Sequence, residues 1–361
     1  MRCPALAAAA LLTSATAAPS QRVALEGGHG PNALEQLVET LALPDKRPAA
    51  MDKLWLVGAP AVPQLATVVA RGGDAAVPAL QLLALLGGRA RPAVPQLQRL
   101  LQAGGHRCQH EIEFALAAIG ERDTVLVADY RGFVIEFDAD GKELRRVKHP
   151  WAWGVQPLAG DRLLVAADAL GVEEIDWTGK VFWSAKPLSG GLDARRLIDG
   201  TTVVACWGAS CVIGLDAAGK ELWRIAGVNA IDVEPLPNGN FLVAGHDDRV
   251  VLEANSKGEV VWKQSLADAP MDVDLLPDGN LLVTMDKARR IVELDRRGHE
   301  LRSLSVEQDP EDSQRLPDGR TFVAWGDGAA LLDPTGKVIW RYKGSQCGRV
   351  VARIGAAPGG R

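Results

Sequence analysis

The sequence predicts an α+β multidomain protein, in which a short N-terminal α-solenoid precedes a six-bladed β-propeller closed by the C-terminal strand. Three observations support this prediction. Apolar residues recur at helical spacing through residues 31–120, whereas β-branched runs bounded by Gly, Asp or Asn fill residues 121–355. Within the second region two different glycine turns each recur every 38 to 40 residues, which is the length of one four-stranded blade.

The N-terminus has the layout of a secretory signal peptide over residues 1–18. Arg2 precedes an apolar run, Ala5–Leu12, which is too short to span a bilayer and is followed by small residues. Residues 19–30 are interpreted as a linker and residues 356–361 as a C-terminal tail. We therefore expect export to the periplasm or the extracellular space, with no transmembrane segment.

The helical region repeats short phrases. "AVPQL" occurs twice, and prolines stand where a helix begins, as proline at the first helical position favours. The glycines that end successive helices are 29 and 33 residues apart, at Gly58, Gly87 and Gly120. These phrases resemble HEAT repeats, which implies stacked helix pairs.

The first turn of each propeller unit has a constant chemistry. Its six glycines are Gly141, Gly179, Gly219, Gly258, Gly298 and Gly336. Three residues earlier stand Asp138, Asp176, Asp216, Asn255, Asp295 and Asp333. Asp or Asn followed by Gly three residues on is typical of a type I turn, so these acids have a structural explanation. Four residues after the glycine, four units carry Trp183, Trp223, Trp262 and Trp340, which we expect to pack between blades.

The two ends of the propeller region complement each other. "GRVVARI", Gly348–Ile354, looks like the strand that opens each unit, but no unit follows it. The first unit, from Thr124, lacks such an opening strand. We predict that Val350 and Val351 join the sheet of Val125, which would leave the ring without a free inner edge.

Four blades place an acid seven residues before the second turn glycine, where the innermost strands surround the axis. These acids are Asp193, Asp232, Asp272 and Asp312, and Trp153 takes the remaining slot. One interpretation is that the carboxylates converge on a divalent cation such as calcium, or on a cationic ligand. The other is that each acid caps its own loop or bonds to the backbone of the adjacent blade.

The segment "KHPWAWG" departs from the repeat. His149, Trp151 and Trp153 could line one side of an axial pocket, or the tryptophans could pack against the helical region. Buried, perturbed carboxylates together with His149 in one pocket would favour an enzyme, whereas loop-capping acids would favour a scaffold.

Four cysteines remain after the signal peptide is removed, and they permit three pairings. In an exported protein we favour Cys206 with Cys211, which leaves Cys108 with Cys347. Four separate buried thiols are the alternative.

Two resemblances bear on function. "LDPTGKVIW" and "IDWTGKVFW" resemble the repeats of pyrroloquinoline-quinone (PQQ) type propellers, a family that includes quinoprotein alcohol dehydrogenases and a cofactor-free outer-membrane assembly scaffold. The dehydrogenases mark their site with adjacent cysteines, which this chain lacks, so the resemblance implies architecture without PQQ.

"IDVEPLPNGNFLV" looks like the repeats of bacterial arylsulfotransferases, which are periplasmic six-bladed propellers with axial histidines. The corresponding positions here hold no histidine: they are Ala152, Leu192, Ile231, Met271 and Glu311.

The formal net charge of -5 and the lack of a basic run argue against nucleic acid as a partner.

The first functional hypothesis is an exported, non-catalytic binding or scaffold protein for a protein, glycan or small-molecule partner, with no cofactor predicted. The alternative is an enzyme that uses the axial channel, either a diverged sulfotransferase or a lyase or hydrolase acting on a glycan or small molecule.

Overall fold

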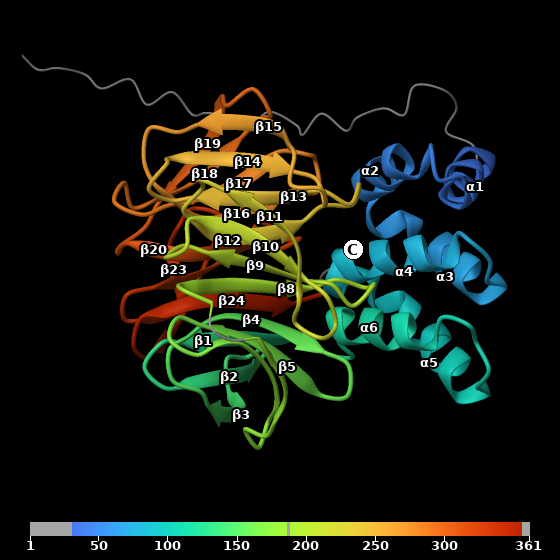
Figure 1. Cartoon of the computed structure of the whole chain (residues 1–361), viewed down its shortest axis with the longest axis horizontal. Helices are drawn as coiled ribbons and strands as arrows, with labels where there is room; N and C mark the ends of the chain where they lie inside the picture. The colour runs from blue at the N-terminus through green and yellow to red at the C-terminus, as the bar shows by residue number, and fades with distance from the viewer. Residues whose placement is uncertain (1–30, 186–187, 356–361) are drawn as a thin grey trace, which may run out of the picture.

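The computed structural model describes residues 31–185 and 188–355, in which a helical region packs against a β-propeller (Figure 1). The helices are α1 (Pro31–Glu39), α2 (Arg47–Val57), α3 (Val62–Arg71), α4 (Ala76–Leu86), α5 (Val94–Ala103) and α6 (Gln109–Ile119), with 3₁₀ turns at Thr40–Ala42, Ala59–Ala61 and Gly87–Ala93. The expected signal peptide, linker and C-terminal tail lie outside the described residues.

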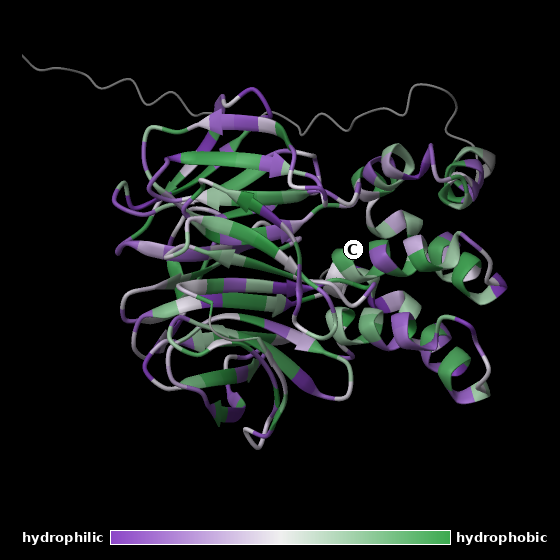
Figure 2. Cartoon of the chain, in the orientation of Figure 1, coloured by the Kyte–Doolittle hydropathy of each residue, from purple (hydrophilic) through white to green (hydrophobic). Residues whose placement is uncertain are grey.

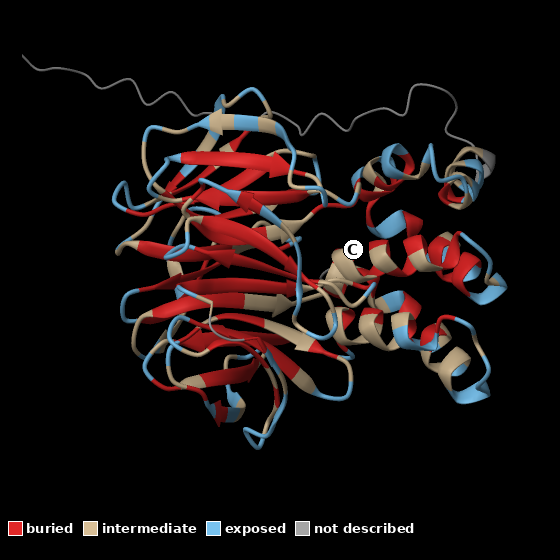
Figure 3. Ribbon diagram, viewed as in Figure 1, coloured by how far each residue is buried: buried red, intermediate tan, exposed pale blue. Residues whose placement is uncertain are grey.

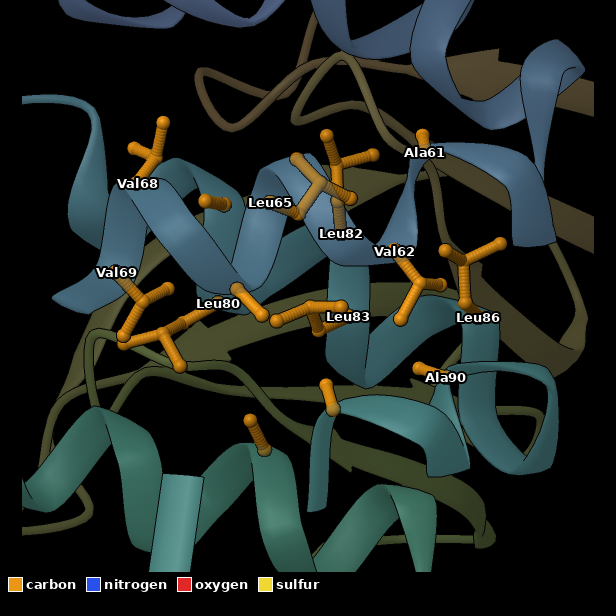
Figure 4. Close-up of a cluster of buried hydrophobic side chains, with 14 of the residues drawn as sticks. Ala61, Val62, Leu65, Val68, Val69, Leu80, Leu82, Leu83, Leu86 and Ala90 are labelled. Carbon is orange, nitrogen blue, oxygen red and sulfur yellow. The ribbon is translucent and has the colours of Figure 1, made fainter. Parts of the chain in front are cut away.

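The helical region consists of similar successive units. A 3₁₀ turn with a proline in the first helical turn leads into α3 and again into α5, and each is followed by a second helix. Leu65 of α3 and Leu83 of α4 are fully buried in the shared core shown in Figure 4. The predicted helical repetition is confirmed at this level, while the HEAT type of the repeat stays a prediction.

Six four-stranded antiparallel sheets form the propeller, as predicted. The first blade contains β24 (Cys347–Arg353), β1 (Thr124–Asp129), β2 (Phe133–Asp138) and β3 (Glu143–Lys148); the second contains β4 (Ala152–Leu158), β5 (Arg162–Ala167), β6 (Gly171–Asp176) and β7 (Val181–Ala185). The third contains β8 (Gly191–Arg196), β9 (Thr202–Cys206), β10 (Cys211–Leu215) and β11 (Glu221–Ala226); the fourth contains β12 (Ala230–Pro235), β13 (Phe241–Gly245), β14 (Val250–Ala254) and β15 (Val260–Ser265). The fifth contains β16 (Pro270–Leu275), β17 (Leu281–Met285), β18 (Arg290–Leu294) and β19 (Glu300–Ser305); the sixth contains β20 (Pro310–Arg315), β21 (Thr321–Trp325), β22 (Gly328–Leu332) and β23 (Val338–Lys343).

The C-terminal strand closes the ring. β24 pairs antiparallel with β1, with Val350 opposite Val127 and Val351 opposite Leu126. The last strand of the chain thereby becomes the innermost strand of the first blade (Figure 1). The prediction of ring closure is confirmed, and the inner edge of β1 is covered.

Apolar side chains fill the space within and between blades. The middle strands are rich in Val, Ile, Leu and Ala and appear green in Figure 2, whereas turns and outer strands are more polar. In Figure 3 the strands β14 and β17 are buried, while the outermost strand β15 is largely exposed. Each blade therefore buries both faces of its middle strands against its neighbours, as expected for a propeller.

The tryptophan of the repeated turn motif forms a hydrogen bond to the next blade. The Trp183 indole N–H donates to the Ala217 carbonyl at 2.9 Å, and the Trp262 indole N–H donates to the Arg296 carbonyl at 3.0 Å. Both carbonyls belong to the aspartate turn of the next blade. Within its own turn the Asp176 carboxylate accepts from the Thr178 and Lys180 backbone N–H groups, so both structural interpretations of the motif are confirmed.

The helical region is fastened to the propeller by polar and backbone contacts. The buried Trp55 indole N–H donates to the Leu276 carbonyl at 3.1 Å, and Arg91 donates to the Arg353 carbonyl at 2.7 Å. Gly88 approaches the chain so closely that a Cβ atom there would lie 2.3 Å from the Ile354 carbonyl oxygen. Helices α2, α4 and α6 lie on the side facing the propeller (Figure 1).

In the described part of the chain no single helix is long and apolar enough to cross a membrane. Only Arg47–Val57 taken together with Ala59–Arg71 passes that test, and this pair is bent by 113°.

Candidate functional site

The six innermost strands present one residue each at the same height around the propeller axis. The strand register identifies these positions as Gly154, Asp193, Asp232, Asp272, Asp312 and Arg349. A register shift directly before each position marks a β-bulge, which re-aims the following side chain. The structure therefore brings the four predicted acids together.

Each acid bonds to the backbone of the next blade. The backbone N–H groups of Val233, Val273, Ser313 and Val350 donate to Asp193, Asp232, Asp272 and Asp312 at 3.5, 3.2, 3.2 and 2.8 Å, respectively. All four acids are buried. The structure thus shows the second interpretation, in which each acid bonds to the backbone of the adjacent blade. The bond from Val350 extends this pattern to the closing strand β24.

The four carboxylates also face a guanidinium group. Arg349 Nη1 forms an ion pair with Asp232 and lies 3.6 Å from Asp193 Oδ2, 3.7 Å from Asp272 Oδ1 and 3.5 Å from Asp312 Oδ1. A side chain of the protein therefore supplies positive charge where the sequence suggested a bound cation. Sequence reasoning missed Arg349, although aligning "GRVVARI" with "IDVEPLP" would have placed it in the column of acids.

Trp153 was predicted to take the axial position of the second blade, and this prediction is wrong. Gly154 occupies the axial position of the second blade: it lies opposite Ala166, at the same spacing as Asp232 and Ala244. The turn glycine Gly160 stands one residue earlier in its hairpin than Gly239 does, so counting seven residues back from it gives Trp153. A Cβ atom at Gly154 would lie 2.6 Å from Asp193 Oδ1, so this glycine leaves room for the neighbouring acid.

Trp153 is instead the bulged residue. Its ring meets that of Tyr130 edge-on, with centroids 5.7 Å apart. It also packs on a buried cluster that includes Leu192, Ile231 and Met271, the bulged residues of the next three blades.

A second set of polar residues lies two positions further along the inner strands. Arg195 reaches Asp193 Oδ1 at 2.7 Å and Glu234 Oε2 at 3.4 Å. Asp274 holds the equivalent position in the fifth blade, and Gln156 and Gln314 hold it in the second and sixth.

Acids outnumber bases in this axial cluster. Six carboxyl groups, those of Asp193, Asp232, Glu234, Asp272, Asp274 and Asp312, face two guanidinium groups, those of Arg195 and Arg349. Burial first, and repulsion from the neighbouring acids second, raises the pKa of Asp232, Asp272, Asp274 and Asp312 well above the usual aspartate value. The cluster therefore favours bound protons or additional positive charge.

A cavity of about 520 Å³ opens over this second set of residues, between the propeller axis and the helical region. All six inner strands contribute to its lining. Its polar lining includes Gln156, Arg195, Glu234, Asp274 and Gln314, and its apolar lining includes Val77, Leu85, Phe114, Leu236 and Phe241. Asp199 and Gly239 also line it and are exposed, so the cavity reaches solvent. Its volume lies in the range of small-molecule sites.

His149 and Trp151 lie away from this cavity. Both precede β4, at the opposite end of that strand from Gln156. His149 Nε2 is 3.1 Å from Glu173 Oε2 in a buried pair, and Trp151 is 43% exposed.

A metal centre is not evident in residues 31–185 and 188–355: no three His, Cys, Asp or Glu side chains are arranged to hold an ion. Calcium binding stays a prediction.

The four cysteines are buried free thiols in the structure. Cys206 and Cys211 face each other across β9 and β10, and burial raises the pKa of Cys206 to about 12. Cys108 belongs to the core of the helical region and Cys347 to a separate propeller cluster. The structure therefore brings the first pair together but not the second.

The fold and the axial cluster define a class: six-bladed propellers with PQQ-like repeats, here capped by a helical region. The family model described as outer membrane protein assembly factor BamB matches residues 130–224 and 208–346, which together span more than half of the chain. The chain belongs to this family.

No curated protein sequence matches the chain significantly. Among solved structures, a protein of unknown function from Bacteroides caccae is similar, with 19% identity, a TM-score of 0.54, and coverage of 64% of this chain and 98% of that one. A chain of a nidogen/laminin complex has 9% identity, a TM-score of 0.52 and the same coverages. A streptogramin B lyase has 14% identity and a TM-score of 0.43, and covers 54% of this chain and 68% of that one. At these identities the similarities concern the fold alone.

Proposed function

We propose that the protein is an exported, non-catalytic scaffold of the cell envelope that binds another protein. The observation that supports this most is the use of the axial acids. They bond to neighbouring backbone and to Arg349, so the acids that recur in four of the blades hold the ring together. Membership of a family described as an assembly factor is consistent with this role.

The position of His149 favours the scaffold over an enzyme. A catalytic site was expected to combine perturbed carboxylates with this histidine in one pocket. The carboxylates Glu234 and Asp274 border the cavity, but His149 pairs with Glu173 beyond its lining.

The outermost strands offer a surface for a protein partner. An apolar residue three positions after each turn glycine is between 40% and 55% exposed in five blades; these are Phe182, Leu222, Val261, Leu301 and Ile339. They lie on β7, β11, β15, β19 and β23, each of which ends its sheet. A strand that ends a sheet can accept an extended segment of another protein by backbone hydrogen bonding.

Site-specific photocrosslinking in the producing cell tests the proposal. A crosslinker at Leu222 or Ile339 is expected to capture one discrete protein in the envelope fraction, whereas one at Asp140, in an exposed turn, is not. The mass of the mature chain would also show the loss of residues 1–18. A cytoplasmic chain of full length, or equal crosslinking from all three positions, would contradict the proposal.

An enzyme remains the second candidate because carboxyl groups with raised pKa border a cavity of suitable size. Turnover of a glycan or small molecule that Asp274→Asn abolishes would favour it.

A further inference from the structure

We propose that the cavity between the helical region and the propeller axis binds a small organic cation, in which an ammonium group lies next to a hydroxyl or carbonyl oxygen on an apolar body. This proposal goes beyond the scaffold function and does not depend on it.

The ammonium group is inferred from Asp274. This carboxylate lines the cavity and is partly exposed to it, and no residue of the described chain forms a hydrogen bond or ion pair with it. The other axial acids are bonded to backbone N–H groups or to Arg195 and Arg349. Asp274 is therefore an acceptor available to a ligand, within a cluster that has too few positive charges.

The neighbouring oxygen is inferred from Arg195, which lines the same cavity. Its side chain is only 8% exposed, and its Nη2 has no hydrogen-bond partner among the described residues. Asp232 Oδ1 lies 3.9 Å from Nη2, which is beyond hydrogen-bonding distance. A buried donor without an acceptor is costly, and a ligand oxygen would satisfy it.

The apolar body is inferred from the opposite walls. Phe114 of α6 and Leu85 of α4 face the cavity from the helical region, and Leu236 and Phe241 face it from the propeller. Burial of apolar surface against these residues would add affinity for a branched or cyclic hydrocarbon. A fully solvated inorganic ion would not use these walls.

Calorimetric titration of the full-length protein with leucinol tests the proposal, because leucinol combines an ammonium group, a hydroxyl group and an apolar branch. Isoamylamine lacks the hydroxyl group, and isoamyl alcohol lacks the ammonium group. We expect leucinol to bind most tightly and isoamyl alcohol at least tenfold more weakly, since hydrogen bonds to charged groups contribute this much or more.

Asp274→Asn is expected to weaken leucinol binding about tenfold to a hundredfold. The variant should fold normally, because the substitution removes no hydrogen bond or ion pair within the described chain; thermal unfolding checks this. Asp278→Asn is the matched control: it removes the same charge from the same blade, but Asp278 bonds to Asn280 in an exposed turn outside the cavity lining.

Three outcomes would overturn the proposal. They are equal affinity for leucinol and isoamyl alcohol, unchanged leucinol binding by Asp274→Asn, and binding of calcium chloride but not of leucinol. None of them affects crosslinking from Leu222 or Ile339, so the scaffold function can be judged separately.

Discussion

The Asp312 carboxylate accepts a hydrogen bond from the Val350 backbone N–H at 2.8 Å and thereby joins the sixth blade to the strand that completes the first. The same bond links the third blade to the fourth, the fourth to the fifth and the fifth to the sixth. One repeated contact thus serves both for stacking successive blades and for closing the ring.

The closing strand should be indispensable for cooperative folding. A chain that ends at Gln346 lacks β24 and exposes both the inner edge of β1 and the buried faces of Val125 and Val127. We expect loss of the single urea transition and aggregation on size-exclusion chromatography. A chain that ends at Gly355 retains β24 and should unfold as the full-length protein does; a stable monomer without β24 would contradict the role of ring closure.

Replacement of Arg349 by methionine should destabilise the protein by about 3–5 kcal/mol at pH 7, because it leaves the surrounding carboxylates without their central charge. The pKa values of Asp232, Asp272 and Asp312 are already raised in the folded state, so these carboxyl groups bind protons more tightly in the folded protein than in the unfolded chain. The loss should therefore be smaller at pH 5 than at pH 8.

Urea unfolding at the two pH values measures this difference. Arg71→Met is the control, since Arg71 forms an exposed ion pair with Glu39 and should change stability by less than about 1 kcal/mol. A loss that is the same at both pH values would show that the guanidinium does not offset the acids.

Alanine at Gly141 should be more destabilising than alanine at Gly200. Both glycines have positive φ, +80° and +87°, so both substitutions strain the backbone by about 1–2 kcal/mol. Only at Gly141 would the new Cβ atom overlap the Trp340 ring of the sixth blade, whereas nothing lies within 4 Å at Gly200. We expect about 1–3 kcal/mol of additional destabilisation for Gly141→Ala by thermal or urea unfolding. Equal effects would contradict close packing of Trp340 against this turn.

The stability of the protein should depend on Glu311 between about pH 4.5 and 7. Burial raises the pKa of this carboxyl to about 7, although Gln346 donates a hydrogen bond to it at 2.7 Å. A carboxyl group whose pKa is higher in the folded protein than in the unfolded chain contributes stability at pH values below its unfolded-state pKa of 4.5. This contribution is lost as the pH rises through 7. Glu311→Gln should therefore become progressively more stable relative to the wild type over this window, by up to about 3 kcal/mol.

The control for this series is Glu307→Gln, because Glu307 is an exposed partner of Arg341. Its stability relative to the wild type should vary little with pH. A pH-independent effect of Glu311→Gln would be inconsistent with a raised pKa.

Cys206 and Cys211 should form a disulfide when the protein is oxidised. They are directly opposed on β9 and β10, whereas Cys108 and Cys347 belong to separate cores. Peptide mapping under non-reducing conditions should find the first pair linked and the other two cysteines alkylated. A Cys108–Cys347 link would contradict the arrangement of the two regions.

The blades could be predicted from the sequence because each of them is a local structure. Strands that follow one another in the chain pair with one another, and turns such as Asp176–Gly179 satisfy their own backbone. A period close to 40 residues therefore fixes the number of blades, and an unpaired strand pattern at Gly348–Ile354 predicts closure.

The tertiary structure alone decided which other side chains meet the four predicted acids at the axis. Arg349 and Asp232 are 117 residues apart and come together only because the ring closes. Gly154 rather than Trp153 faces Asp193, because the turn glycine Gly160 sits one residue earlier in its hairpin than the glycines of the other blades, which the strand register shows and the glycine spacing does not. The cavity exists because the helical region covers the axis, and its lining combines Phe114 with Asp274 through packing that no local pattern encodes. Local hydrogen bonding and periodicity set the blades, whereas the site depends on contacts between distant segments.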